Sequence, residues 1–159
     1  AVACSTLLGH RLGAEEYEAA WQHSQLFLLL APIGALLVGI AVWLLQTNLL
    51  QWVGNLPGEL MTEAGQVLAI MCLGMLLKVF NMVGIIGVLR SGGDVNYSIV
   101  IDIIAMWCIG LPLAWVAVSL LGWPLSWVVA VVLLEELCKV LLVQRRIRQR
   151  HWLKNLVMG

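Results

Sequence analysis

Four long stretches of apolar residues run along this chain, and short polar segments separate them. The stretches cover residues 26–45, 64–89, 97–121 and 124–143. The first contains 20 uncharged residues, and at about 1.5 Å per residue this matches a hydrocarbon core of roughly 30 Å. The pattern therefore predicts an all-α integral membrane protein, built as an antiparallel bundle of transmembrane helices.

The basic residues outside these stretches occur on alternate connections. Connections 46–63 and 122–123 contain neither lysine nor arginine. The other connections and the C-terminal tail hold Arg11, Arg90, Arg145, Arg146, Arg148, Arg150 and Lys154. Because short basic loops stay in the cytoplasm, we expect 9–24, 90–96 and the tail 144–159 to be cytoplasmic. The protein is then a multi-pass protein of the cell membrane, with connection 46–63 in the periplasm.

The composition narrows the class of protein further. Only 11% of the residues are charged, against roughly 25% in a soluble domain. The basic tail directly follows a membrane span, which indicates a membrane anchor and no nucleic-acid partner. The four cysteines are scattered singly, so neither disulfides nor a metal site are predicted. Sequence motifs of hydrolases such as GxSxG and HExxH are missing, so we do not expect an enzyme.

Residues 1–8 have the composition of the end of another apolar helix. No positively charged leader precedes them, so no signal peptide is visible. We therefore expect the chain to be a fragment of a longer protein.

Ionisable residues also lie inside the apolar stretches: Lys78, Asp102, Glu135, Glu136 and Lys139. Each costs about 2.5–3.5 kcal/mol at the centre of a membrane helix, so each needs a partner or a water-filled cavity. Lys78 lies at least roughly 16 Å from either end of its span. Its side chain reaches only about 6 Å, so it cannot extend to the membrane surface. Glu135 lies at a similar depth.

Two interpretations of these residues remain open. In the first, they only form ion pairs: Glu135 and Lys139 share one helix face, and Lys78 could neutralise any of the acids. We predict that Lys78 lies close to Glu135 or Glu136. In the second, three acids face two lysines, and the remaining carboxyl is protonated or binds a cation, which permits ion coupling. The candidates for a substrate or ion pathway are Lys78, Asn81, Asp102, Glu135 and Glu136.

A tight turn is predicted between the second and third spans. Gly92 and Gly93 permit positive φ angles there. Arg90 suits the C-terminus of the preceding helix, and Asp94 can cap the N-terminus of the next. These four residues therefore have a predicted structural role.

Three segments resemble a known family of transporters. Residues 9–14, with the sequence GHRLGA, are followed by Glu18 and Ala20. They resemble the G-x-x-L-G-A…E-x-A connector of the multidrug and toxic compound extrusion (MATE) family. Residues 87–94 are similar to its G-x-L-R-[AGS]-G-x-D turn. Residues 133–139 and the arginine-rich end resemble bacterial members.

The resemblance implies twelve helices in two six-helix lobes, of which this chain would supply most of the C-terminal lobe. The complete protein would be a monomer in the lipid bilayer that exports small cationic or amphipathic drugs and toxins. Export would be coupled to Na⁺ or H⁺ entry and would need no other cofactor. The partners would be the small-molecule substrate and the N-terminal lobe of the same chain. Two alternatives stay open: a flippase or exporter of lipid-linked glycans, and a non-transporting membrane subunit whose buried charges hold helices together.

Overall fold

The computed structural model describes residues 1–53 and 57–154, and most of these residues are helical. Residues 54–56 of the predicted periplasmic connection and 155–159 of the predicted cytoplasmic tail lie outside the described residues. In chain order the helices are α1 (Val2–Gly13), α2 (Tyr17–Leu44), α3 (Gln46–Val53), α4 (Gly58–Met82), η1 (Val83–Leu89), α5 (Val95–Ile104), η2 (Ala105–Gly110), α6 (Leu111–Trp115), η3 (Val116–Leu120) and α7 (Leu125–Arg148). The three η segments are π-helical turns within longer rods.

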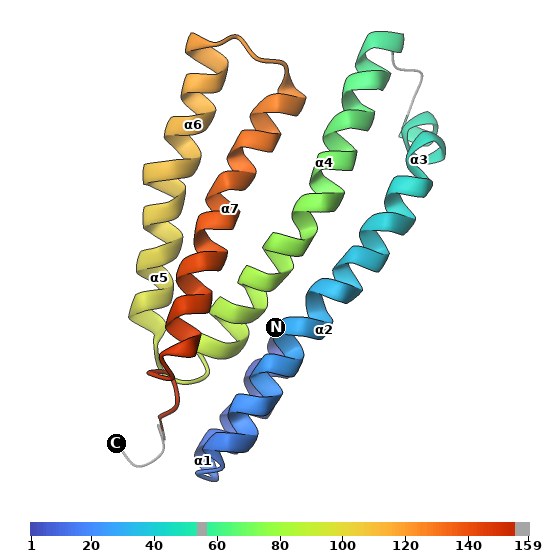
Figure 1. Cartoon of the computed structure of the whole chain (residues 1–159). Helices are drawn as coiled ribbons and strands as arrows, with labels where there is room; N and C mark the ends of the chain where they lie inside the picture. The colour runs from blue at the N-terminus through green and yellow to red at the C-terminus, as the bar shows by residue number, and fades with distance from the viewer. Residues whose placement is uncertain (54–56, 155–159) are drawn as a thin grey trace.

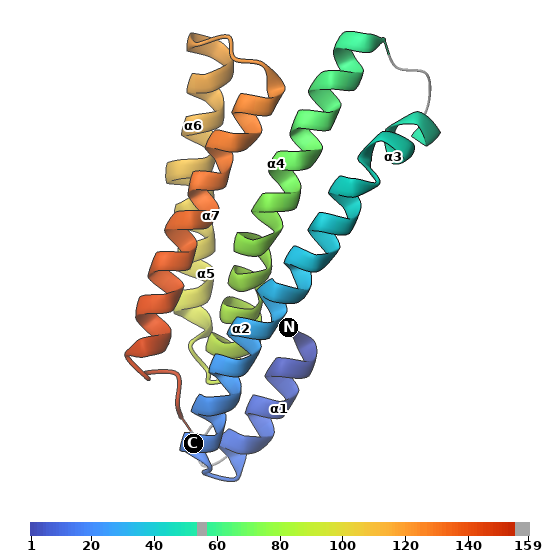
Figure 2. The same cartoon turned by 45° about the vertical axis from the view of Figure 1, so that its right-hand side comes forward.

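The long helices form an antiparallel bundle (Figure 1). Helix α4 lies between α2 and α7 and contacts both, and α7 also packs on η2. Helix α1 lies against α2 and η1 at one end of the bundle (Figure 2). The prediction of an all-α membrane helix bundle is thereby confirmed.

Within the described residues, three helical rods are long and apolar enough to cross a membrane: Tyr17–Leu44, Gly58–Leu89 and Val95–Leu120. Helix α7 has 24 residues, or about 36 Å, and runs alongside them. It is less apolar because Glu135, Glu136 and Lys139 interrupt its middle.

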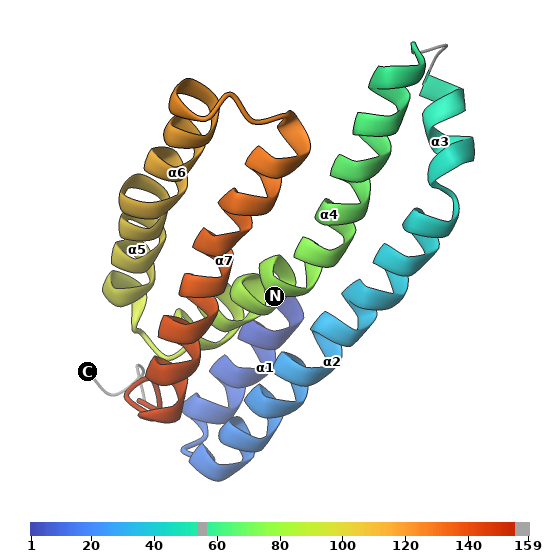
Figure 3. The same cartoon turned by 45° about the horizontal axis from the view of Figure 1, so that its top comes forward.

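The connections alternate between the two ends of the bundle. The turns after α1 and η1 and the end of α7 lie at the lower end in Figure 1. The α2–α3 junction and the turn between η3 and α7 lie at the upper end (Figure 3). The arginines that we assigned to the cytoplasmic side, Arg11, Arg90, Arg145, Arg146, Arg148 and Arg150, are therefore gathered at one end.

The polar connections are more helical than we expected. The connector predicted at 9–24 is reduced to residues 14–16, because α1 ends at Gly13 and α2 begins at Tyr17. The connection 46–63 contains the helix α3. Polar residues continue a helix beyond the membrane because each added turn satisfies its own backbone hydrogen bonds. Hydropathy therefore predicted where the chain crosses the membrane, but not the residues at which the helices begin and end.

The C-terminal tail is part of the protein core. Trp152 is fully buried, and its indole N–H donates a hydrogen bond to the carbonyl of Ile147 at 3.3 Å. It packs in an apolar cluster with residues of several helices: Cys4, Leu8, Leu12, Leu28, Val83, Val88, Leu89, Val143 and Ile147. The described part of the tail thus folds back onto the bundle.

The turn after η1 needs its two glycines for different reasons. The amide of Asp94 donates to the carbonyl of Leu89 at 3.0 Å, and that of Gly93 to Arg90 at 3.1 Å. This is the Schellman pattern, which requires a left-handed residue, and Gly93 has a φ of 81°. Gly92 is not left-handed. A Cβ atom there would lie 1.8 Å from the carbonyl oxygen of Trp152, so Gly92 leaves room for the tail.

The predicted capping role of Asp94 is wrong. Asp94 is the N-cap residue of α5, but its side chain makes no capping hydrogen bond. Its carboxylate accepts hydrogen bonds from Arg146 instead, so an opposite charge on α7 takes the place of the helix end. Arg90 lies at the C-terminal end of η1, as predicted, and its guanidinium reaches Asp102 at 3.8 Å.

Candidate functional site

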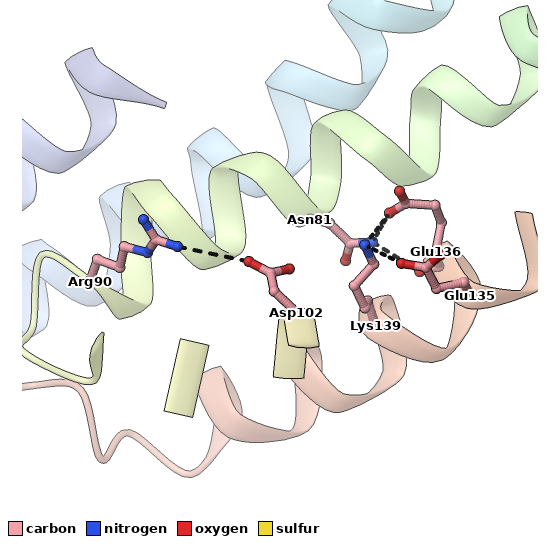
Figure 4. Close-up of polar contacts among 6 residues, drawn as sticks. All are labelled: Asn81, Arg90, Asp102, Glu135, Glu136 and Lys139. Carbon is pink, nitrogen blue, oxygen red and sulfur yellow. Dashed lines mark hydrogen bonds and ion pairs between the residues drawn. The ribbon is translucent and has the colours of Figure 1, made fainter. Parts of the chain in front are cut away.

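A cluster of charged side chains lies inside the bundle, where α7 faces α4 (Figure 4). Glu135, Glu136 and Lys139 are three and four residues apart, so they share one face of α7. The Lys139 ammonium lies 2.9 Å from Oε1 of Glu135 and 3.4 Å from Oε2 of Glu136. Only 12–16% of these three side chains is exposed. The ion pair expected between Glu135 and Lys139 is confirmed.

Asn81 connects this cluster to α4. Its Nδ2 donates to Oε2 of Glu136 at 2.8 Å and to the backbone carbonyl of Glu136 at 2.9 Å. Asn81 is only 3% exposed. Its Oδ1 is buried and has no hydrogen-bond partner among the described residues. A buried acceptor without a donor costs free energy. The Oδ1 atom of Asn81 is therefore a candidate for accepting a hydrogen bond from a donor that binds reversibly.

Glu135 fits against a glycine of η2. A Cβ atom on Gly110 would lie 2.2 Å from Oε2 of Glu135, so the missing side chain makes room for the carboxylate. Sequence reasoning missed Gly110. The available signal was a single glycine inside an apolar span, which often marks a close approach between elements.

Lys78 lies at the same pocket as Glu136, but the predicted ion pair of Lys78 with Glu135 or Glu136 is not formed among the described residues. Lys78 is exposed, and among the described residues it forms no ion pair. Lys139 forms ion pairs with both acids instead, because a neighbour one turn away on the same helix needs no particular packing between helices. Lys78 lies beside a pocket of about 160 Å³. The polar residues that line this pocket are Lys78, Asn81, Asp102, Glu136 and Lys139.

The structure therefore brings together four of the five predicted pathway residues. Lys78, Asn81, Asp102 and Glu136 meet at the pocket, and Glu135 joins them through Lys139. Within residues 1–53 and 57–154, no three His, Cys, Asp or Glu side chains are close enough to hold a metal ion.

A second charged group lies at the basic end of the bundle. Nε and Nη2 of Arg146 donate to the Asp94 carboxylate at 2.6 and 3.1 Å, and the guanidinium lies 4.4 Å from the ring centre of Tyr97. The hydrogen bonds to Asp94 raise the pKa of Arg146 above its ordinary value, so this residue is charged at any physiological pH. Arg150 pairs with Glu18 at 2.7 Å. These contacts tie α7 to the turn at 90–94, and the residues just after α7 to the first turn of α2, and they have a structural role.

The chain is similar to known proteins over most of its length. It is 26% identical over 150 residues to the uncharacterized transporter YisQ of Bacillus subtilis (strain 168). The match covers 94% of this chain and 32% of that relative, so the chain spans about a third of its length. No solved structure matches the chain. The MatE family model matches residues 1–116, which confirms the resemblance noted in the sequence. The chain belongs to the MatE family of membrane transporters.

Proposed function

We propose that this chain is most of the C-terminal lobe of a secondary active exporter, which moves small cationic or amphipathic compounds out of the cell. Membership of the MatE family supports transport, as does the likeness to a protein described as a transporter. Entry of H⁺ or Na⁺ drives the export. The transporter acts within the lipid bilayer, and the remaining lobe of the same protein completes it.

The observation that carries this proposal is the charged pocket inside a membrane bundle. Lys78 is exposed and without an ion-pair partner among the described residues, although it lies well inside the rod Gly58–Leu89. A lysine at this depth is stable only if water reaches it. The pocket beside Lys78 therefore belongs to a water-filled pathway, which is what a transporter needs between its lobes.

The acids of the pocket bear on the substrate class. Asp102 and Glu136 line it together with Lys78 and Lys139, and each acid has a basic partner, Arg90 for Asp102 and Lys139 for Glu136. A cationic compound and a coupling ion would compete with these partners for the carboxylates. Competition of this kind is the physical basis of exchange, because each species releases the other.

One observation favours a rival function. Lys139 contacts both Glu135 and Glu136, so the cluster can also serve only to hold α7 in place. A non-transporting membrane subunit would need nothing more. A flux measurement separates the two functions.

The test is export of a cationic dye by the full-length protein, produced in bacterial cells that lack their own efflux pumps. We expect Glu136→Gln to reduce dye export about tenfold or more, since the removed charge lies at the pocket. Glu63→Gln is the control, because Glu63 accepts a hydrogen bond from the Leu125 amide far from the cluster. Glutamine can accept the same bond. An absence of export by the unmodified protein, at normal abundance, would favour the structural subunit.

The orientation of the bundle gives an independent prediction. With the arginines in the cytoplasm, a cysteine at the exposed position Glu59 should react with a membrane-impermeant maleimide in intact cells. A cysteine at the exposed position Gln149 should react only after the cells are opened. The four native cysteines are first replaced by serine or alanine. Labelling of Gln149→Cys in intact cells, with Glu59→Cys silent, would reverse the assignment.

A further inference from the structure

We propose that the outward face of α7 binds an anionic phospholipid, with the headgroup phosphate held by Arg145 and Arg148 and the acyl chains along the leucines of the same face. This face, which we call the outer stripe, consists of Trp127, Leu134, Leu137, Leu141, Arg145 and Arg148. Successive members are three, four or seven positions apart, so they lie on one side of a helix. All six side chains are exposed.

The leucines and arginines of the outer stripe face away from the packed side of α7. Leu133 and Val143 lie on that packed side, against the rod of α4 and η1. A Cβ atom on Gly74 would lie 2.6 Å from Leu133, and one on Gly84 would lie 2.6 Å from Val143. Helix α7 therefore uses another face to pack on its neighbours, and the outer stripe is free for a partner outside the described chain.

The outer stripe has the length and the two ends of a surface that crosses a membrane. Trp127 and Arg145 are 18 positions apart, or about 27 Å along the helix, against a hydrocarbon core of roughly 30 Å. The members of the stripe between them are all leucine. Tryptophan is enriched at the membrane–water interface, and arginine at the cytoplasmic end of a span. The stripe thus suits acyl chains along its middle and a headgroup at its basic end.

Arg145 and Arg148 differ from the other arginines at this end in their lack of an acidic partner. Within residues 1–53 and 57–154, no ion pair joins either of them to a carboxylate. Arg148 lies 3.2 Å from the side-chain amide of Gln144, which carries no charge. The other four pair with acids: Arg11 with Glu16, Arg90 with Asp102, Arg146 with Asp94 and Arg150 with Glu18. Two positive charges therefore stand at the end of an apolar stripe without a counter-charge from the described chain.

The chemistry of these two side chains points to a phosphate. A guanidinium binds a phosphate through two parallel N–H···O hydrogen bonds. Arg145 and Arg148 are three residues apart, so they are neighbours on the helix surface and can reach one headgroup together. A zwitterionic phospholipid carries the same phosphate, but its ammonium group repels the arginines. The pair therefore selects a lipid with net negative charge.

The test is native mass spectrometry of the full-length transporter in detergent, titrated with phosphatidylglycerol and, in parallel, with zwitterionic phosphatidylcholine. We expect phosphatidylglycerol to bind more tightly. Its association constant for the first bound lipid should fall about fivefold in Arg145→Gln or Arg148→Gln and about 25-fold in the double variant, given the usual contribution of one arginine beside a membrane. Phosphatidylcholine binding should change little.

Arg11→Gln is the matched control. It removes a charge from the same end of the bundle, but Arg11 already pairs with Glu16, so we expect less than a twofold change. Unchanged binding of phosphatidylglycerol by the double variant would overturn the proposal, as would equally tight binding of phosphatidylcholine by the unmodified protein. Displacement of the lipid by an equal concentration of glycerol phosphate would also contradict it, because the site would then be one for a soluble phosphate.

A second measurement shows whether lipid or the other lobe covers the outer stripe in the full-length protein. After replacement of the native cysteines, nitroxide labels are attached to Leu137→Cys and Leu141→Cys in phospholipid vesicles. We expect O₂, which concentrates in lipid, to relax both labels, and a water-soluble nickel chelate to have little effect. Protection from both reagents would mean that protein covers the stripe, and relaxation by the chelate would place it in water. Either result would refute a lipid site, and neither depends on transport.

Discussion

The variant Gly92→Ala is expected to release the C-terminal tail and to lower the free energy of unfolding of the intact protein by about 3 kcal/mol, the lower end of the cost of losing a buried tryptophan. A Cβ atom at this position would lie 1.8 Å from the carbonyl oxygen of Trp152 and 3.0 Å from its Cβ. The first of these is a backbone atom and cannot rotate away. The tail must therefore leave, and the fully buried Trp152 leaves with it.

Chemical unfolding in detergent measures this loss, and limited trypsin digestion reports on the tail itself. The tail carries cleavage sites at Arg148 and Arg150, and we expect both to be cut faster in the variant. Gly9→Ala is the matched control, since Gly9 is exposed on α1 and nothing lies within 4 Å of the Cβ atom that alanine would add. If Gly92→Ala proved as stable and as resistant to trypsin as this control, the packing of Trp152 against Gly92 would be wrong.

The features that the sequence could predict are the local ones. Hydropathy predicts the membrane rods, and the placement of the arginines predicts that the basic connections lie at one end of the bundle. Both patterns depend on residues that are close together in the chain. The Glu135–Lys139 pair follows in the same way from the spacing of one helical turn. The left-handed glycine of the turn at 90–94 was also accessible to sequence reasoning, although Gly93 alone has this conformation there.

The features that sequence reasoning missed depend on how helices are rotated against each other. Lys78 and Glu136 lie at similar depth, yet depth does not say which faces of α4 and α7 meet. The structure turns Asn81 toward Glu136 and leaves Lys78 beside the pocket. Trp152 falls in the segment 144–159 that we assigned to the cytoplasmic tail, and its burial was not predicted. Its burial depends on the space left by Gly92, which no local pattern reveals.

The variant Gly110→Ala is expected to have the second large effect. The expected loss is in transport and not in folding stability. In Gly110→Ala the new Cβ atom would lie 2.2 Å from Oε2 of Glu135 and 3.1 Å from its Cδ. The clash involves the end of a flexible side chain, so the carboxylate can swing away at little cost in stability. Alanine also favours the helix by about 1 kcal/mol relative to glycine. The ion pair of Glu135 with Lys139, which measures 2.9 Å, is then disturbed.

If the proposed function is correct, we expect Gly110→Ala to lower dye export by about 10- to 100-fold, since a displacement of roughly 1 Å in a positioned group can cost this much. Normal abundance and unfolding behaviour should accompany the loss. Gly34→Ala on α2 is the matched control, because nothing lies within 4 Å of the added methyl group. The double variant Gly110→Ala/Glu135→Asp should recover part of the export, because the shorter acid avoids the alanine. Full export by Gly110→Ala would show that the place of the Glu135 carboxylate does not matter for transport, whereas a loss without rescue would indicate damage to the packing of α7 on η2.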